Sequence, residues 1–174
     1  MSQPPGSGYA STKPMNRLLA ALPPAEMEVL RPDLEEVSLP FKQSLYEVDQ
    51  PVEYAYFLHW GVASMTTPME NGTEIEVATV GPEGMVGLPV YFDALIAGRG
   101  FMQVPGEGAR IKAEAFKRAL EPTPHLRWLL GRYTLALVNQ LAQNSACNRM
   151  HEAEQRLARW LLLTQDRAHS TTFP

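Results

Sequence analysis

The chain has 174 residues, 45% of them hydrophobic and 20% charged, which is typical of a globular protein with a buried core. Its net charge of −4 argues against a free-standing nucleic-acid-binding domain, because such domains are usually basic. The single cysteine excludes an internal disulfide and any multi-cysteine metal or iron–sulfur site. Without a membrane-length apolar run or a signal-peptide pattern, we expect a cytoplasmic protein with no membrane partner.

The N-terminal part of the chain predicts a tail followed by two short helices. Residues 1–13 are rich in Pro, Gly and Ser and predict a disordered tail. The helices are expected in MNRLLAAL (15–22) and AEMEVL (25–30), because prolines follow both segments and end helices.

From residue 35 to residue 112 the sequence consists of short apolar runs separated by turn residues. The predicted strands are VSLPF, SLYEV, YAYFLHW, VASMTT, EIEVATV, FMQV and ARIKA. Their close spacing favours a β-roll or sandwich over a parallel sheet with crossover helices. In EIEVATV, polar and apolar residues alternate, which predicts that Ile75 and Val77 face the core and that Glu74 and Glu76 face solvent.

The C-terminal third is predicted to be helical, with one long helix at about 125–151 between shorter helices at 113–120 and 152–167. The long helix carries two apolar stripes. The first stripe contains Leu126, Leu130, Tyr133, Leu137 and Leu141. The second stripe, which we call the seam, contains Trp128, Gly131, Leu135, Val138, Ala142 and Ser145.

The seam alternates steps of three and four residues, which is the spacing of a coiled-coil heptad. A helix that is apolar on two faces needs two partners. We therefore expect the first stripe to pack on the chain's own β-domain and the seam to pack on a second copy. The alternative is a helix buried within one monomer, for which the chain has little other helix.

The segment 72–104 (GTEIEVATVGPEGMVGLPVYFDALIAGRGFMQV) predicts a strand, a glycine-rich turn, a short helical turn and a lone arginine before the next strand. This layout is typical of a small-anion pocket made by backbone N–H groups and a guanidinium. Arg99 lies between Gly98 and Gly100, so it could approach an anion closely. The alternative is a surface arginine on a flexible loop.

Other candidate sites are weak. His59 stands alone within its strand, so a packed residue is favoured over a metal or haem ligand, and a cupin-type metalloenzyme lacks its ligand cluster. Cys147 is expected to be a passive helical thiol rather than a redox switch. Glu152, Glu154 and Arg156 read as a solvated helix face, and no catalytic arrangement is apparent, so we expect no enzyme.

Several motifs in this order resemble the Crp/Fnr family of bacterial transcription regulators. LYEVDQPVEYAYFLHWGVASM, with a turn at Gly61, resembles two hairpins of a cyclic-nucleotide-binding β-roll, and NGTEIEVATVGPEGMVGL resembles the strand that enters the phosphate cassette. AFKRAL resembles the helix after the roll, and RLARWLL resembles the connector to a winged helix-turn-helix. The resemblance covers about 16–167.

The resemblance implies a double-stranded β-helix (β-roll) with flanking helices and a long C-terminal dimerisation helix, mainly β with some α. It divides the chain into a tail (1–13), a roll with N-terminal helices (14–122), dimerisation and connector helices (123–168), and a tail (169–174) leading to a missing DNA-binding domain. A homodimer is implied, with DNA and RNA polymerase contacted only through that absent domain. We expect the chain to be the sensor half of a longer protein rather than a natural truncation.

Three departures from the family pattern argue against cyclic AMP as the effector. Leu88 stands where cyclic-AMP-responsive members have a glutamate for the ribose hydroxyl, and Pro89 removes a backbone donor. Leu141 and Ala142 stand where the catabolite activator presents hydroxyls to adenine. A different small anionic or amphipathic effector is expected between the cassette and the long helix, and a ligand-free structural dimeriser is the alternative. The expected ligand-binding residues are Gly87, Leu88, Arg99, Gly100, Leu137 and Leu141.

Overall fold

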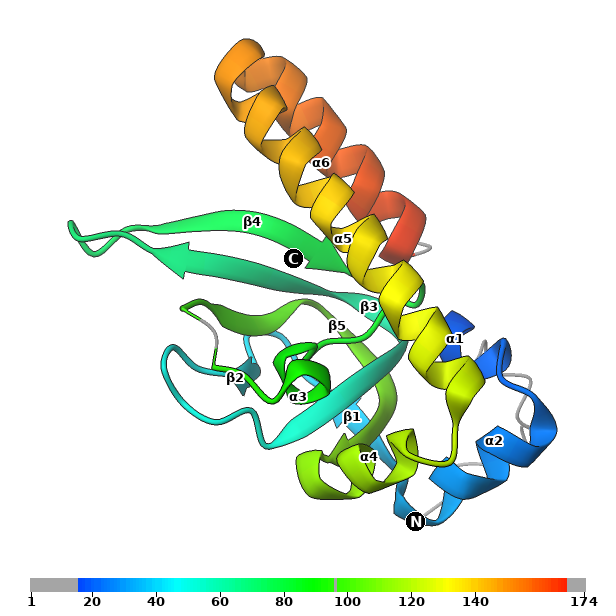
Figure 1. Ribbon diagram of the computed structural model, residues 1–174. Coiled ribbons are helices and arrows are strands. Elements are labelled where there is room, and N and C mark those ends of the chain that lie inside the picture. Colours follow the sequence, from blue (N-terminus) through cyan, green and yellow to red (C-terminus); the bar gives the residue numbers. More distant parts are fainter. Residues whose placement is uncertain (1–15, 96, 169–174) are drawn as a thin grey trace, which may run out of the picture.

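The computed structural model describes residues 16–95 and 97–168, which form a five-stranded antiparallel sheet flanked by helices (Figure 1). The strands are β1 (Glu35–Leu39), β2 (Ser44–Tyr46), β3 (Tyr54–Pro68), β4 (Glu74–Val80) and β5 (Arg99–Lys112). The helices are α1 (Arg17–Ala20), α2 (Pro24–Leu30), the 3₁₀ turn η1 (Arg31–Asp33), α3 (Pro89–Phe92), α4 (Ala113–Leu120), α5 (Pro124–Met150) and α6 (Ala153–Ala168). The expected fold class, a β-roll with flanking helices and a long C-terminal helix, is confirmed. The predicted tails lie outside the described residues.

The sheet order is β1-β5-β3-β4, with β2 paired to the start of β5. The two separate strands expected at 54–60 and 62–67 are one continuous strand, β3, and those expected at 101–104 and 109–113 belong to the continuous β5. The predicted turn at Gly61 is instead a bulge inside β3, where the register with β5 shifts. A Cβ on Gly61 would lie 2.9 Å from Gly106 Cα, so facing glycines let the two strands stay paired through the kink.

The alternation expected for β4 is wrong. Burial increases along the strand instead: Glu74 and Ile75 are exposed, Glu76 and Val77 are half-buried, and the last three residues are buried. The physical reason is that β4 is an edge strand that extends outward from the core, with its C-terminal end closest to the core (Figure 1).

The core lies between the concave side of the roll and the helices α1, α4 and α5. Phe57 of β3 and Phe116 of α4 are fully buried and meet edge to face at 5.9 Å between ring centroids. The first half of the first stripe of α5 packs on this core, since Leu126 and Leu130 are fully buried in it and Tyr133 lies against it. Leu137 is 7% exposed and lies outside this cluster. At the start of α5 the Glu26 carboxylate of α2 accepts the backbone N–H groups of His125 and Leu126, both at 2.9 Å.

Asn16 joins the N-terminal helices to the roll and is itself fully buried. Its Oδ1 caps α1 by accepting two backbone N–H groups, and its Nδ2 donates to Leu58 O at 3.0 Å and Gly84 O at 2.8 Å. Its backbone N–H donates to His59 Nδ1, which leaves the His59 Nε2–H to donate to Glu36 at 3.1 Å. His59 is therefore a hydrogen-bonded core residue.

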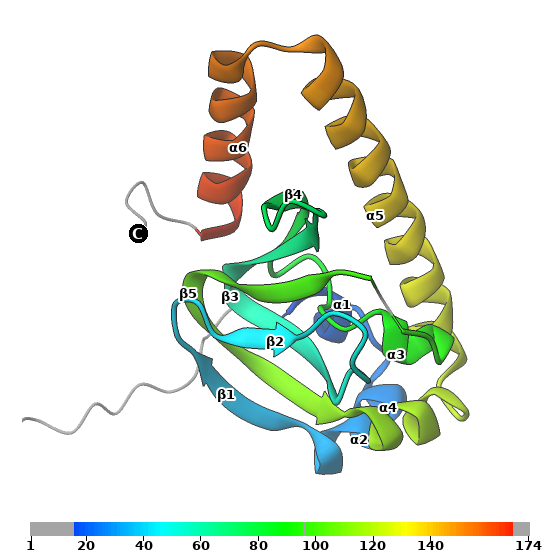
Figure 2. The same ribbon diagram turned by 90° about the vertical axis from the view of Figure 1, so that its left-hand side faces the viewer.

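The helices α5 and α6 form a hairpin that straddles the end of β4 (Figure 2). α6 contacts β3, and α5 contacts β4, so the connector helix folds back onto the roll. None of the described helices is both long and apolar enough to cross a membrane.

Candidate site at the cassette, α5 and α6

The cassette is the loop 81–88 with α3, and it is fixed to β3 and to α5. Val86 and Tyr56 exchange backbone hydrogen bonds of 2.8 and 2.9 Å. Gly87 has φ +94°, and a Cβ there would lie 2.6 Å from Tyr54 O, so only glycine fits this close approach. The Tyr133 ring of α5 lies against Gly84, where a Cβ would be 2.4 Å from its Cε2.

Tyr133 is also the anchor between α5 and the cassette. Its hydroxyl donates to Met85 O at 2.8 Å. Burial, followed by the nearby Glu83 carboxylate, raises the pKa of Tyr133 well above its usual value. The phenol is therefore neutral at every physiological pH and keeps its donor role.

Arg99, the expected anion-binding residue, is already held by carboxylates. Its Nη1 donates to Glu74 Oε1 at 2.9 Å, and its Nε lies 3.8 Å from Glu47 Oε2. Thr66 donates to the other oxygen of Glu74, and this hydrogen bond, followed by Arg99, lowers the pKa of Glu74 below its usual value. An incoming anion would have to displace an ionised carboxylate.

The expected ligand-binding residues lie in two groups. Gly87 and Leu88 belong to the cassette, and Arg99 and Gly100 begin β5, with the Tyr46 ring against Gly100. Leu137 and Leu141 lie on α5, where Leu137 is buried and Leu141 is half-buried.

The contacts of α5 separate the cassette helix from Leu141. The hydroxyl of Tyr91 in α3 donates to Arg127 O, near the start of α5 and 14 residues before Leu141, or about 21 Å of helix. Leu137 lines a cavity between α5, α1 and the cassette loop. None of the other five expected residues lines that cavity, the cavity beside α6 or the cavity between α3 and α4. A shared ligand site for the six residues stays a prediction.

Two amides of α5 pair with the edge of β4. Gln140 Nε2 donates to Thr79 O at 3.1 Å, and Asn144 Nδ2 donates to Val77 O at 2.9 Å. Residues four apart on a helix are spaced like residues two apart on a strand, so the two amides reach successive outward carbonyls. The long helix thereby covers part of the sheet edge.

α6 is attached to the roll at its last turn and to α5 in its first half. Arg167 Nε donates to Glu83 Oε1 and its Nη1 donates to Thr79 Oγ1, each at 2.6 Å, with the arginine side chain only 14% exposed. Arg159 donates to Asn144 Oδ1 at 3.0 Å. These contacts make α6 a neighbour of the cassette loop rather than a free connector.

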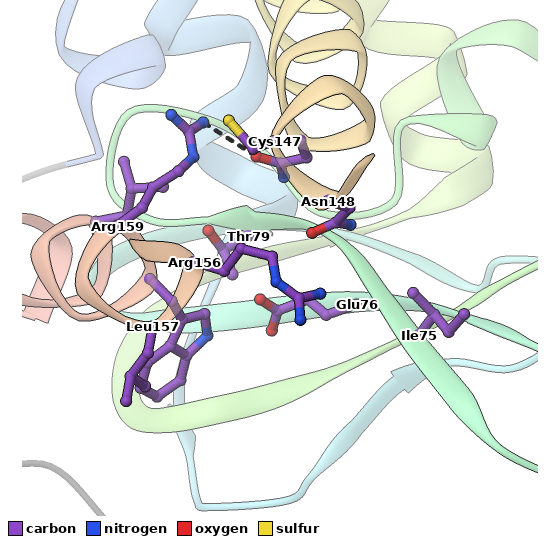
Figure 3. Close-up of a pocket in the computed structure, with 11 residues that line it drawn as sticks. Ile75, Glu76, Thr79, Cys147, Asn148, Arg156, Leu157 and Arg159 are labelled. Atoms are coloured by element: carbon purple, nitrogen blue, oxygen red, sulfur yellow. Dashed lines mark hydrogen bonds between the residues drawn. The ribbon is translucent and has the colours of Figure 1, made fainter. Parts of the chain in front are cut away.

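Cavities flank these helices. One of about 330 Å³ lies between β4, the end of α5 and α6 (Figure 3), and one of about 460 Å³ lies between α5, α1 and the cassette loop. A third, of about 180 Å³, lies between α3 and α4. Among residues 16–95 and 97–168, no group of three or more His, Cys, Asp or Glu side chains could hold a metal ion.

Sequence reasoning missed the residues of α6 that line the first cavity. The sequence predicts that Arg156 belongs to a solvated helix face, and the residue is indeed exposed. It also lines this cavity together with Arg159 and Trp160. The signal in the sequence is the spacing in RLARW, which places two arginines three residues apart and so on one helix face. Cys147 is buried and accepts a hydrogen bond from Gln143, as expected for a passive thiol.

Known proteins resemble this chain in structure and not in sequence. No family model and no curated protein sequence matches it. A protein assigned to the Crp/Fnr family of transcriptional regulators from Eubacterium rectale superposes with a TM-score of 0.71 at 12% identity, over 86% of this chain and 71% of that one. The chain therefore shares its fold with this regulator over most of its length.

Two further regulators share the Crp/Fnr-type fold. CLP from Xanthomonas campestris, named as a c-di-GMP-responsive global regulator, has a TM-score of 0.68 at 14% identity, over 86% of this chain and 76% of that one. FixK2 from Bradyrhizobium japonicum has a TM-score of 0.65 at 18% identity, over 77% of this chain and 67% of that one. At these identities the similarity establishes the fold, and function has to be argued from the chain's own residues.

Proposed function

We propose that the chain is the effector-sensing and dimerisation module of a Crp/Fnr-like transcription regulator, and not an enzyme. The observation that carries this proposal is the two-faced α5: its first stripe is buried or half-buried against the rest of the chain, while its seam is exposed. Trp128 is 55% exposed, Leu135 62% and Val138 51%. Exposed apolar side chains in heptad spacing favour a helix partner, and a second copy supplies the same seam.

In this proposal the homodimer works in the cytoplasm and contacts DNA and RNA polymerase only through a winged helix-turn-helix domain that would follow α6. An effector bound between the roll and α5 would shift the two α5 helices between two arrangements. Tyr133 and Arg167 support this coupling, because they connect the cassette loop directly to α5 and α6.

Cyclic AMP is disfavoured as the effector by the residues of the cassette. Leu88 offers no acceptor to a ribose hydroxyl, and Arg99 is neutralised by Glu74 and Glu47. A lost partner for one buried hydroxyl costs about 1–3 kcal/mol of binding free energy. The Xanthomonas regulator is named as responsive to c-di-GMP, so that dinucleotide belongs in any ligand trial.

We expect isothermal titration calorimetry of the chain to show no saturable heat with cyclic AMP up to about 1 mM. c-di-GMP and inorganic phosphate are titrated in the same way, each against Arg99→Ala and, as an exposed control, Arg149→Ala. Saturable binding that is lost only in Arg99→Ala would support a cassette sensor. The absence of saturable heat with all three ligands would favour the ligand-free dimeriser. Micromolar binding of cyclic AMP that is lost in Arg99→Ala would contradict the proposal that the cassette disfavours cyclic AMP.

A further inference from the structure

The cavity between β4, α5 and α6 has the properties of a ligand site that is separate from the cassette and from the seam. Its volume of about 330 Å³ lies within the range of small-molecule pockets. Figure 3 shows side chains from both helices and from β4 turned toward a common space. The cavity is formed by a single copy of the chain, so it does not depend on dimerisation.

Its cationic side comes from α6. Arg156 extends across the cavity in Figure 3, and its guanidinium makes no hydrogen bond or ion pair with any residue in the described ranges 16–95 and 97–168. Arg159 lies one turn further along and uses one nitrogen for Asn144. In Figure 3 the Arg159 guanidinium is turned toward the end of α5, while the Arg156 guanidinium lies on the Glu76 side of the cavity. Both add positive charge to the same lining, and of the two guanidiniums only that of Arg156 is without a partner among the described residues.

Glu76 is the one acidic residue of the lining, and it is already satisfied by other donors. Ser64 Oγ donates to its Oε2 at 2.6 Å, Gln103 Nε2 donates to the same oxygen at 2.9 Å, and the Trp160 side chain is a further donor. Burial raises the pKa of Glu76, while these hydrogen bonds act in the opposite direction. The lining holds two arginines against this one carboxyl group. The cavity therefore keeps a positive balance despite this carboxyl group.

The remaining surface of the cavity is apolar. Ile75 of β4 is 45% exposed and Leu157 of α6 is 56% exposed, and both line the space together with Leu163. Exposed aliphatic side chains around a cavity favour an occupant with an apolar body.

We propose that this cavity binds a small amphipathic carboxylate. Arg156 binds the carboxylate group, Arg159 adds a second positive charge to the lining, Asn148 offers an amide, and the apolar body of the ligand packs on Ile75, Leu157 and Leu163. A ligand in this place touches β4, α5 and α6 at once, so it stabilises α6 in its folded-back position. The site thereby couples a metabolite-sized acid to the helix that would lead to a DNA-binding domain.

The probe is 3-phenylpropionate, with octanoate as a second acid and 3-phenylpropanamide as the neutral analogue. Isothermal titration calorimetry is expected to give one site per chain for at least one acid, and at least about tenfold weaker binding of the amide. Arg156→Gln is expected to weaken binding of the acid at least about tenfold, because a charge-assisted contact is lost. Arg149→Gln, an exposed arginine of α5 outside the cavity, is expected to leave the affinity unchanged.

The position of the bound acid is checked by the indole N–H signal of Trp160 in ¹H–¹⁵N spectra. This signal is assigned with the variant Trp160→Phe, and we expect it to shift when the acid is added. Binding is expected to persist in Arg99→Ala and in Leu135→Asp, so the result is independent of the cassette and of the dimer. The proposal is overturned if neither acid binds up to about 10 mM. Equal affinities of the parent and Arg156→Gln, or a Trp160 signal that does not move, would overturn it as well.

Discussion

Replacing Leu135 by aspartate is expected to convert the proposed dimer into a monomer. Leu135 lies in the middle of the seam and is 62% exposed on a single copy, so a partner helix would bury it. Each dimer loses two such leucines and gains two charges, and about 1.5–3 kcal/mol accompanies the burial of each leucine side chain. The dissociation constant should therefore rise at least about 100-fold.

Sedimentation equilibrium at micromolar concentration measures this change directly. Leu162→Asp is the matched control, since Leu162 of α6 is also 62% exposed and lies outside the seam. We expect this control to keep the mass of a dimer. A parent chain that sediments as a monomer, or an unchanged mass for Leu135→Asp, would contradict the assignment of the seam as the interface.

Replacing Asn16 by alanine is expected to lower the free energy of unfolding by about 3 kcal/mol. The substitution removes the cap of α1 and leaves the buried Leu58 and Gly84 carbonyls without their amide donor. A helix cap contributes about 1 kcal/mol, and an unsatisfied buried group costs about 1–3 kcal/mol.

Urea denaturation at a fixed protein concentration is the measurement, because the proposed dimerisation would make the midpoint concentration-dependent. Asn148→Ala, at an exposed position of α5, should stay within about 0.5 kcal/mol of the parent. An Asn16→Ala midpoint equal to that of the parent would show that the connection from α1 to the roll carries little stability.

Much of the fold could be predicted because its signals are local. The prolines at 23 and 24, at 32 and at 122 and 124 mark helix boundaries, and the seven-residue strand at 74–80 was predicted with its bounds. Of the first stripe of α5, Leu126, Leu130 and Leu137 are buried, while Tyr133 and Leu141 are half-buried. The fusion of the predicted strands into β3 and β5 was missed, because Gly61 breaks a strand locally and is tolerated only where Gly106 faces it.

The candidate site was less accessible to sequence reasoning, because it depends on contacts between distant segments. Nothing near Arg99 in the sequence shows that Glu74 and Glu47 would neutralise it. The folded-back position of α6 depends on Arg167 meeting Glu83 and Thr79, which precede it by more than eighty residues. Local sequence patterns predict where the cassette and the long helix lie in the chain. Ion pairs between elements that are distant in the sequence determine which arginine side chains remain available to a ligand.

Disulfide cross-linking shows whether two copies meet along the seam of α5. In a Cys147→Ser background, Ala142→Cys places one thiol on the seam, and Gln143→Cys places it on the next residue, off the seam. A disulfide needs Cα atoms about 4.4–6.8 Å apart, a distance that seam positions of paired parallel helices approach. Under mild oxidation, we expect a covalent dimer for Ala142→Cys and a monomer for Gln143→Cys on a non-reducing gel. Equal cross-linking of the two variants, or none in either, would show that the seam is not the dimer interface.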